Sequence, residues 1–164
     1  MNGQPHLAAF AASIGLRFRC IVTNAAAITA LAILLFGAAF HVHWAMGGRV
    51  GFGVSLPQHS DGEPVYSGLM HLWRPAALGV AVVLVGIALL VLIHLHWIAL
   101  DIDRRWTGVL LLVSGLMLIA RAVLPNRYVG LFKSLRTTRW ARYDSMLYSP
   151  LILLLGIALL YLAV

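Results

Sequence analysis

The chain has 164 residues, of which 62% are hydrophobic and 10% are charged, with a mean hydropathy of +0.92. Soluble globular domains carry about 25% charged residues, so this composition excludes an ordinary soluble domain and makes lipid the natural solvent for the exterior. The net charge of +7 would suit nucleic acid in a soluble protein. Here the basic residues lie at the ends of apolar runs and in loops, so anionic lipid headgroups are the expected partner and nucleic acid is not.

The first long apolar run predicts a membrane helix over residues 20–41, preceded by Arg17 and Arg19. A basic start followed by an apolar run also describes a secretory signal peptide. This run is longer than the apolar region of such a peptide, so we expect an uncleaved spanning helix. Cys20, at its start, is the single cysteine of the chain, which excludes an intramolecular disulfide and a cysteine-based metal site.

Three further runs predict spanning helices over residues 75–100, 106–124 and 146–164. Pro75 and Pro150 suit first helical turns, and Pro125 ends the third run. A hydrocarbon core of about 30 Å requires about 20 apolar residues per helix, and no run alternates as a barrel strand does. The sequence therefore predicts a single all-α membrane domain over residues 1–164, an antiparallel bundle of four transmembrane helices. Small residues inside the runs would let helices approach closely. They are Ala26, Ala30, Gly37, Gly79, Gly86, Ser114, Gly115 and Gly156.

Four spans place loop 1 (residues 41–74) and loop 3 (residues 125–145) on one side of the membrane, opposite the N-terminus, loop 2 and the C-terminus. The side of loops 1 and 3 holds eight basic residues against four on the other side. The excess favours these loops in the cytoplasm, in a bacterial inner membrane. Arg17 and Arg19 directly flank the first helix and favour the reverse orientation, which stays open.

Loop 3 is the richest in polar side chains. On a helical projection Tyr128, Leu131, Phe132 and Leu135 share one face and Lys133 lies opposite, which predicts a short amphipathic helix in the headgroup layer. Its basic residues would either hold a phosphate or carboxylate or simply meet lipid headgroups.

Arg121 lies about one turn before Pro125, still inside the third apolar run. An intramembrane arginine is costly unless its charge reaches the headgroups or finds a partner. Asp144 precedes the fourth helix on the same membrane side. We therefore predict an Arg121–Asp144 ion pair, with an arginine that reaches the headgroups alone as the alternative.

The seven histidines raise the question of a metal or haem. His41 or His43 together with His71 would offer imidazoles at one end of the bundle, as a bundle haem requires. No tight ligand spacing such as HExxH occurs, so hydrogen-bonded interfacial histidines are the simpler interpretation and no cofactor is expected. The sequence also lacks the GxSxG motif of a nucleophilic hydrolase and a phosphate-binding glycine loop.

Three segments carry a resemblance to a known family. They are His43-Trp44-Ala45-Met46-Gly47-Gly48 after the first helix, a loop 3 string from Arg127 to Asp144, and Leu147-Tyr148-Ser149-Pro150-Leu151 opening the fourth helix. In these the chain resembles domain-of-unknown-function family 3995, a group of small bacterial membrane proteins. The resemblance implies a four-helix membrane protein and no particular activity. The family often has a cysteine soon after Leu151, where this chain has Ile152, which speaks against a thiol-dependent role there.

The matched parts of loops 1 and 3 share one membrane face, so we expect any ligand site there. The candidate residues are Trp44, Gly47, Gly48, Arg121, Arg127, Tyr128, Lys133, Arg139, Asp144 and Tyr148. The first hypothesis is a non-enzymatic protein that binds a lipid, a small anionic ligand or a membrane-protein partner, including a second copy.

The second hypothesis is a small membrane enzyme or carrier acting on an anionic or lipid-derived substrate. Arg127, Lys133 and Arg139 would bind this substrate, and His43 or Asp144 would move protons.

Overall fold

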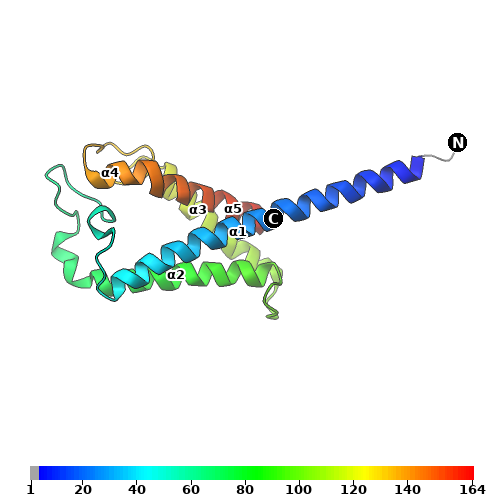
Figure 1. Cartoon of the computed structure of the whole chain (residues 1–164), viewed down its shortest axis with the longest axis horizontal. Helices are drawn as coiled ribbons and strands as arrows, with labels where there is room; N and C mark the ends of the chain where they lie inside the picture. Colours follow the sequence, from blue (N-terminus) through cyan, green and yellow to red (C-terminus); the bar gives the residue numbers. More distant parts are fainter. Residues whose placement is uncertain (1–3) are drawn as a thin grey trace.

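The computed structural model describes the backbone of residues 4–164 and the side chains of residues 13–164 (Figure 1). Over this part of the chain the fold is helical, with one isolated β-bridge between Gln58 and Pro64 and no longer strand. The elements are α1 (Gln4–Ala45), η1 (Phe52–Val54), η2 (Ser67–Leu72), α2 (Trp73–His94), α3 (Arg104–Val123), α4 (Arg139–Tyr143), the π-helical turn η3 (Asp144–Tyr148) and α5 (Ser149–Ala163).

Four helical stretches of the described residues are long and apolar enough to cross a membrane, which confirms the predicted four-span, all-α fold. They are Ser13–Ala45, Ser67–His94, Arg104–Val123 and Arg139–Ala163. The last stretch is continuous because α4, η3 and α5 follow one another without a break.

The helices form two antiparallel pairs, α1 with α2 and α3 with α5, and the pairs meet where α1 packs on α5 and α2 on α3 (Figure 1). Small and aliphatic side chains fill the shared core, among them Ala30, Leu34, Val91, Leu111 and Leu159. The N-terminal part of α1 projects beyond the other helices (Figure 1).

Two glycines account for the close packing of α3 against α5. A Cβ atom at Gly115 would lie 2.9 Å from the carbonyl oxygen of Gly156, and one at Gly156 would lie 2.7 Å from a side-chain carbon of Ile119. Both distances are shorter than real Cβ contacts, so only glycine permits this approach. The expectation that small residues bring helices together is confirmed at this pair. It is not borne out at Gly79 and Gly86 of α2, where an added Cβ atom would meet nothing within 4 Å.

The second helix is shorter than its apolar run. α2 ends at His94 rather than at residue 100, because His96 takes a left-handed conformation with φ of 56° and Trp97 N–H donates to the carbonyl of Leu92 (2.9 Å). This closing pattern satisfies carbonyls at the helix end. The hydropathy of the sequence does not reveal this helix end, because the residues that follow are also apolar. Conversely, α1 begins well before the predicted residue 20.

Loop 3 contains a short helix, α4, but the residues predicted to form an amphipathic helix do not form one. Leu131 and Phe132 lie in a turn, Tyr128 in a bend and Leu135 in irregular backbone. Gly130 interrupts them with φ of 91°, which no regular helix tolerates. The expectation of a helix over these residues is therefore wrong, because the segment folds inward around a buried charge instead of lying flat on a surface.

Candidate functional site on the face of loops 1 and 3

A fully buried carboxylate organises loop 3. Asp144 lies in the π-helical turn η3 and is 0% exposed. Its Oδ1 accepts hydrogen bonds from Arg121 Nη2 (2.9 Å) and Ser149 Oγ (3.0 Å). Its Oδ2 accepts from Lys133 Nζ (2.9 Å) and from the Gly130 backbone N–H (2.9 Å). The predicted Arg121–Asp144 ion pair is confirmed, and each carboxylate oxygen has two donors. We call these five residues the Asp144 cluster.

Lys133 is the unexpected member of the cluster. Its side chain is fully buried, and Nζ donates to Asp144 Oδ2, to the Gly130 carbonyl (2.9 Å) and to Ser145 Oγ (2.7 Å). An ammonium group has three protons to donate, so in this arrangement none is left for an external anion. Of the two cations, Arg121 alone reaches the surface, with 28% of its side chain exposed.

Gly130 shapes the backbone around the cluster. Its positive φ of 91° favours glycine, and a Cβ atom there would lie 3.1 Å from the carbonyl oxygens of both Arg121 and Ala122. The next residue, Leu131, donates its N–H to the Ala122 carbonyl (2.8 Å). Loop 3 therefore folds back over the end of α3. Nothing in the sequence pattern singled out Gly130 for this role.

Loops 1 and 3 touch, as the parity of spans predicts. The Trp140 backbone N–H donates to Gln58 Oε1 (3.2 Å), and the Tyr128 hydroxyl lies 3.3 Å from His59 Nδ1. The Trp140 indole N–H donates to the Tyr128 carbonyl (2.8 Å), and its ring packs against Tyr148 at 5.4 Å between centroids. Trp140, Gln58 and His59 were absent from the candidate residues, because their pairing depends on the loop conformation.

The segment from Trp44 to Gly48 ends α1. The N–H groups of Gly47 and Gly48 donate to the carbonyls of Trp44 and His43, both at 2.9 Å, and Gly47 has φ of 95°. A side chain on Gly48 would collide with the His43 ring, and one on Gly47 with the guanidinium of Arg74. These glycines are thus explained by chain reversal and close packing.

The two remaining candidate arginines lie apart from the Asp144 cluster. Arg127 is exposed and stacks its guanidinium over the Tyr128 ring, 5.4 Å from the centroid. Arg139 is exposed at the first position of α4. Both add to the basic rim of this face.

The three histidines considered for a metal differ in environment. His41 Nδ1 bonds to the Gly37 carbonyl at 2.8 Å, Nε2 of His43 is buried without a hydrogen-bond partner, and His71 is exposed in η2. Among residues 13–164, no three His, Cys, Asp or Glu side chains are grouped as metal ligands would be.

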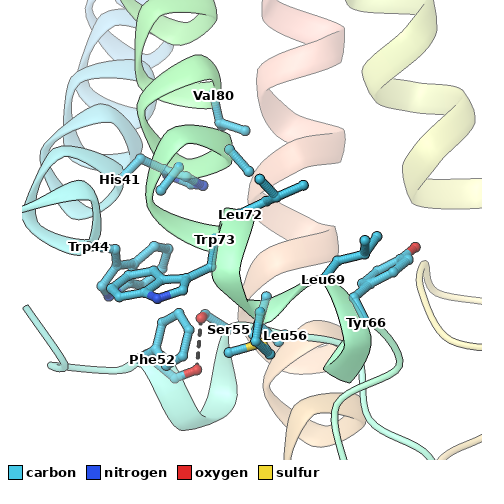
Figure 2. A pocket seen from close by; sticks show the side chains of 13 residues that line it. His41, Trp44, Phe52, Ser55, Leu56, Tyr66, Leu69, Leu72, Trp73 and Val80 are labelled. Carbon is cyan, nitrogen blue, oxygen red and sulfur yellow. Dashed lines mark hydrogen bonds between the residues drawn. The ribbon is translucent and has the colours of Figure 1, made fainter. Parts of the chain in front are cut away.

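A cavity of about 410 Å³ lies between the end of α1, loop 1 and the start of α2 (Figure 2). It is lined by His41, Trp44, Phe52, Ser55, Leu56, Tyr66, Leu69, Met70, Leu72, Trp73, Ala76, Ala77 and Val80. We call it the loop 1 cavity. Its aromatic wall is continuous, because Phe52 packs against Trp73 at 4.6 Å and against Trp44 at 6.3 Å between ring centroids. Of the candidate ligand-binding residues, Trp44 lines it, and so does His41, which was considered for a metal.

The fold defines an integral membrane protein with four apolar helices, and its two long loops pack together at one end of the bundle. Residues 34–159 match the family model described as "Protein of unknown function (DUF3995)", and the chain belongs to this family. The family resemblance is therefore confirmed. No curated protein and no solved structure matches the chain.

Proposed function

We propose that this membrane protein binds an apolar, lipid-derived ligand in the loop 1 cavity. The observation that carries the proposal is the cavity itself, with aromatic and aliphatic walls at the end of the first two spans. Ligand sites occupy about 300–1,000 Å³ and are lined mainly by apolar side chains with a few polar groups. At about 410 Å³ this one suits a single chain or a small ring system better than a two-chain lipid.

The position of the cavity supports entry from the bilayer. Leu69, Leu72 and Val80 line it and are 55%, 47% and 42% exposed. Aromatic side chains such as Trp44 and Trp73 are typical of the headgroup level of a membrane. A ligand dissolved in the bilayer would thus meet exposed apolar side chains on its way in.

The chemistry of the face supports binding rather than catalysis. Asp144, one of the proposed proton carriers, has four donors around its two oxygens. A carboxylate held in this way is stabilised in its charged form and is poorly suited to exchange a proton with a substrate. We therefore favour the non-enzymatic hypothesis over an enzyme or carrier.

We also propose that the protein resides in a bacterial inner membrane with loops 1 and 3 in the cytoplasm. Lys133 and Arg121 are engaged with Asp144. The exposed basic residues on this side are then Arg49, Arg74, Arg127, Arg136, Arg139 and Arg142. They still outnumber the four of the opposite side, Arg17, Arg19, Arg104 and Arg105, as the positive-inside rule requires.

Labelling of a cysteine in loop 1 tests this orientation. In a Cys20→Ser background, the thiol of Ser60→Cys should not react with a membrane-impermeant thiol reagent in intact cells. Reaction with the reagent would show the opposite orientation.

Photolabelling tests the binding proposal. The purified protein, in nanodiscs of phosphatidylcholine, is irradiated with a long-chain alcohol that carries a diazirine, and labelled peptides are mapped by mass spectrometry. We expect labels on cavity residues such as Leu56 and Met70 in excess over the lipid-facing Leu110 and Met117 of α3.

Two alanines provide a matched pair for this experiment. Ala76 lines the cavity and is exposed, so Ala76→Phe should fill the space without disturbing the core. Ala32 is exposed on α1 away from the cavity, and Ala32→Phe is the control. We expect Ala76→Phe to reduce cavity labelling about tenfold, equivalent to about 1.4 kcal/mol of binding free energy. Equal labelling of cavity and lipid-facing residues, or no effect of Ala76→Phe, would contradict the proposal.

A further inference from the structure

His41 supplies the loop 1 cavity with a hydrogen-bonding atom that the protein itself leaves unused. Its Nδ1 lies 2.8 Å from the carbonyl oxygen of Gly37, one turn earlier on α1. A carbonyl oxygen only accepts hydrogen bonds, so Nδ1 carries the proton and donates it. In a neutral imidazole the other nitrogen, Nε2, is then an acceptor with a free lone pair. Among the described residues, no group forms a hydrogen bond with Nε2 of His41. This nitrogen also differs from Nε2 of His43, which is buried without a partner.

His41 lies on the wall of the cavity, and its Nε2 is not sealed within the protein interior. In Figure 2 the His41 side chain extends from α1 toward α2, into the space above Leu72 and Trp73. Its ring packs edge-on against Trp44 at 5.0 Å between centroids. The bond to Gly37 and the contact with Trp44 together hold the imidazole in one orientation, so the acceptor is already in place before any ligand binds.

Two other polar groups on the cavity wall are already used. Ser55 Oγ donates to the Phe52 carbonyl (2.8 Å), and the Trp44 indole N–H donates to the Val50 carbonyl (2.8 Å). Besides His41, the remaining polar groups of the lining are the Tyr66 hydroxyl and the Trp73 indole N–H, and the other side chains are apolar. A ligand that enters this cavity is thus offered apolar contact over most of its surface and an acceptor at His41.

We propose that the ligand is an uncharged amphiphile that ends in a hydroxyl group, such as a long-chain or isoprenoid alcohol or a phenol, and that this hydroxyl donates to His41 Nε2. This inference rests on the proposed function, because it names the chemical class of the ligand bound in the same cavity. A carboxylate or phosphate would turn its oxygen lone pairs toward the lone pair of Nε2, and it would lose hydration against walls that are mostly apolar. A chain without a hydroxyl would leave Nε2 unpaired.

Competition experiments test the requirement for a donor. The diazirine alcohol is displaced in nanodiscs either by an unlabelled alcohol of the same chain length or by its methyl ether, which retains the oxygen but has no proton to donate. We expect the alcohol to displace the label from the wild-type protein at about tenfold lower concentration than the ether, the ratio that about 1.4 kcal/mol produces.

Variants of His41 assign the preference to this residue. His41→Phe keeps a ring but has no acceptor, so the alcohol and the ether should displace the label equally well. His41→Gln keeps an acceptor oxygen and should retain part of the preference for the alcohol. His71→Phe, at an exposed histidine of η2 outside the cavity, is the control and should behave as wild type.

The outcomes separate this inference from the proposed function. Absence of cavity labelling in the wild type would overturn both. Cavity labelling that the alcohol and ether displace equally would overturn the hydroxyl inference and leave the binding proposal standing. A preference for the alcohol that persists in His41→Phe would also overturn the role of His41. If His41→Phe does not fold, the wild-type ratio of alcohol to ether still decides whether a donor is required.

Discussion

The two ends of the same membrane face are opposite in character. The Asp144 cluster, where loop 3 covers α3 and α5, is charged and fully paired. The loop 1 cavity, at the ends of α1 and α2, is almost entirely apolar and leaves an acceptor unpaired at His41. The charged side chains therefore lie in the part of the face that stabilises the fold. The part suited to a ligand is marked instead by space that the protein does not fill.

Removal of the charge at Asp144 tests this contrast most strongly. Asp144→Asn would leave the buried ammonium of Lys133 and the guanidinium of Arg121 without their counter-charge. Loss of one partner of a buried ion pair costs about 3–5 kcal/mol. We expect a loss of this size in the free energy of unfolding, followed by circular dichroism in detergent during thermal or denaturant unfolding.

Asp101→Asn is the matched control, because Asp101 is exposed in the connection between α2 and α3. Surface substitutions of this kind usually change stability by no more than about 0.5 kcal/mol. Equal stability of the two variants would mean that the Asp144 cluster does not stabilise the fold.

A change of one methyl group at Gly130 tests the backbone of the same region. Gly130→Ala places a side chain on a residue with φ of 91°, and its Cβ would lie 3.1 Å from two carbonyl oxygens. Strained backbone conformations cost about 1–3 kcal/mol each, so we expect a loss of stability in this range. Gly68→Ala, where no atom lies within 4 Å of the added carbon, should have a much smaller effect in the same unfolding assay. A larger loss of stability in Gly68→Ala than in Gly130→Ala would show that the conformation of Gly130 does not shape loop 3.

The contact that joins the two regions should give the smallest effect. Tyr128→Phe removes the hydroxyl that lies 3.3 Å from His59 Nδ1. A hydrogen bond of this kind contributes about 0.5–1.5 kcal/mol, so global stability should change little. Hydrogen exchange of the backbone around His59 should become faster, since loop 1 loses a tie to loop 3. Tyr143→Phe, at an exposed tyrosine of α4, is the control. Equal exchange rates around His59 in the two variants would mean that the Tyr128 hydroxyl does not hold loop 1 to loop 3.

The spans and the central ion pair were accessible from the sequence for simple reasons. Apolar runs of spanning length leave the chain little choice except helices in a bilayer. The even number of spans then places Arg121 and Asp144 on the same side, where an intramembrane arginine needs a partner. Neither inference requires knowledge of the conformation of a loop.

The conformation of the loops was not accessible in the same way. Lys133 was expected on the exposed face of a surface helix, yet it is buried, because Gly130 reverses the chain before it. The burial of Lys133 depends on the left-handed conformation of Gly130, and the spacing of apolar residues does not predict this conformation. The loop 1 cavity likewise depends on Phe52 meeting Trp73, residues from two elements whose packing only the folded chain defines.

The π-helical turn η3 has a consequence for how this chain tolerates changes in length. A π-helical turn holds an additional residue within an otherwise continuous α-helical path. One residue corresponds to about 100° of rotation in an α-helix with 3.6 residues per turn. Deletion of a single residue from Asp144–Tyr148 would therefore rotate α4 about the axis of α5 and swing Trp140 away from Gln58. We expect natural insertions and deletions to avoid this segment and to collect in the exposed turn at residues 60–63 of loop 1.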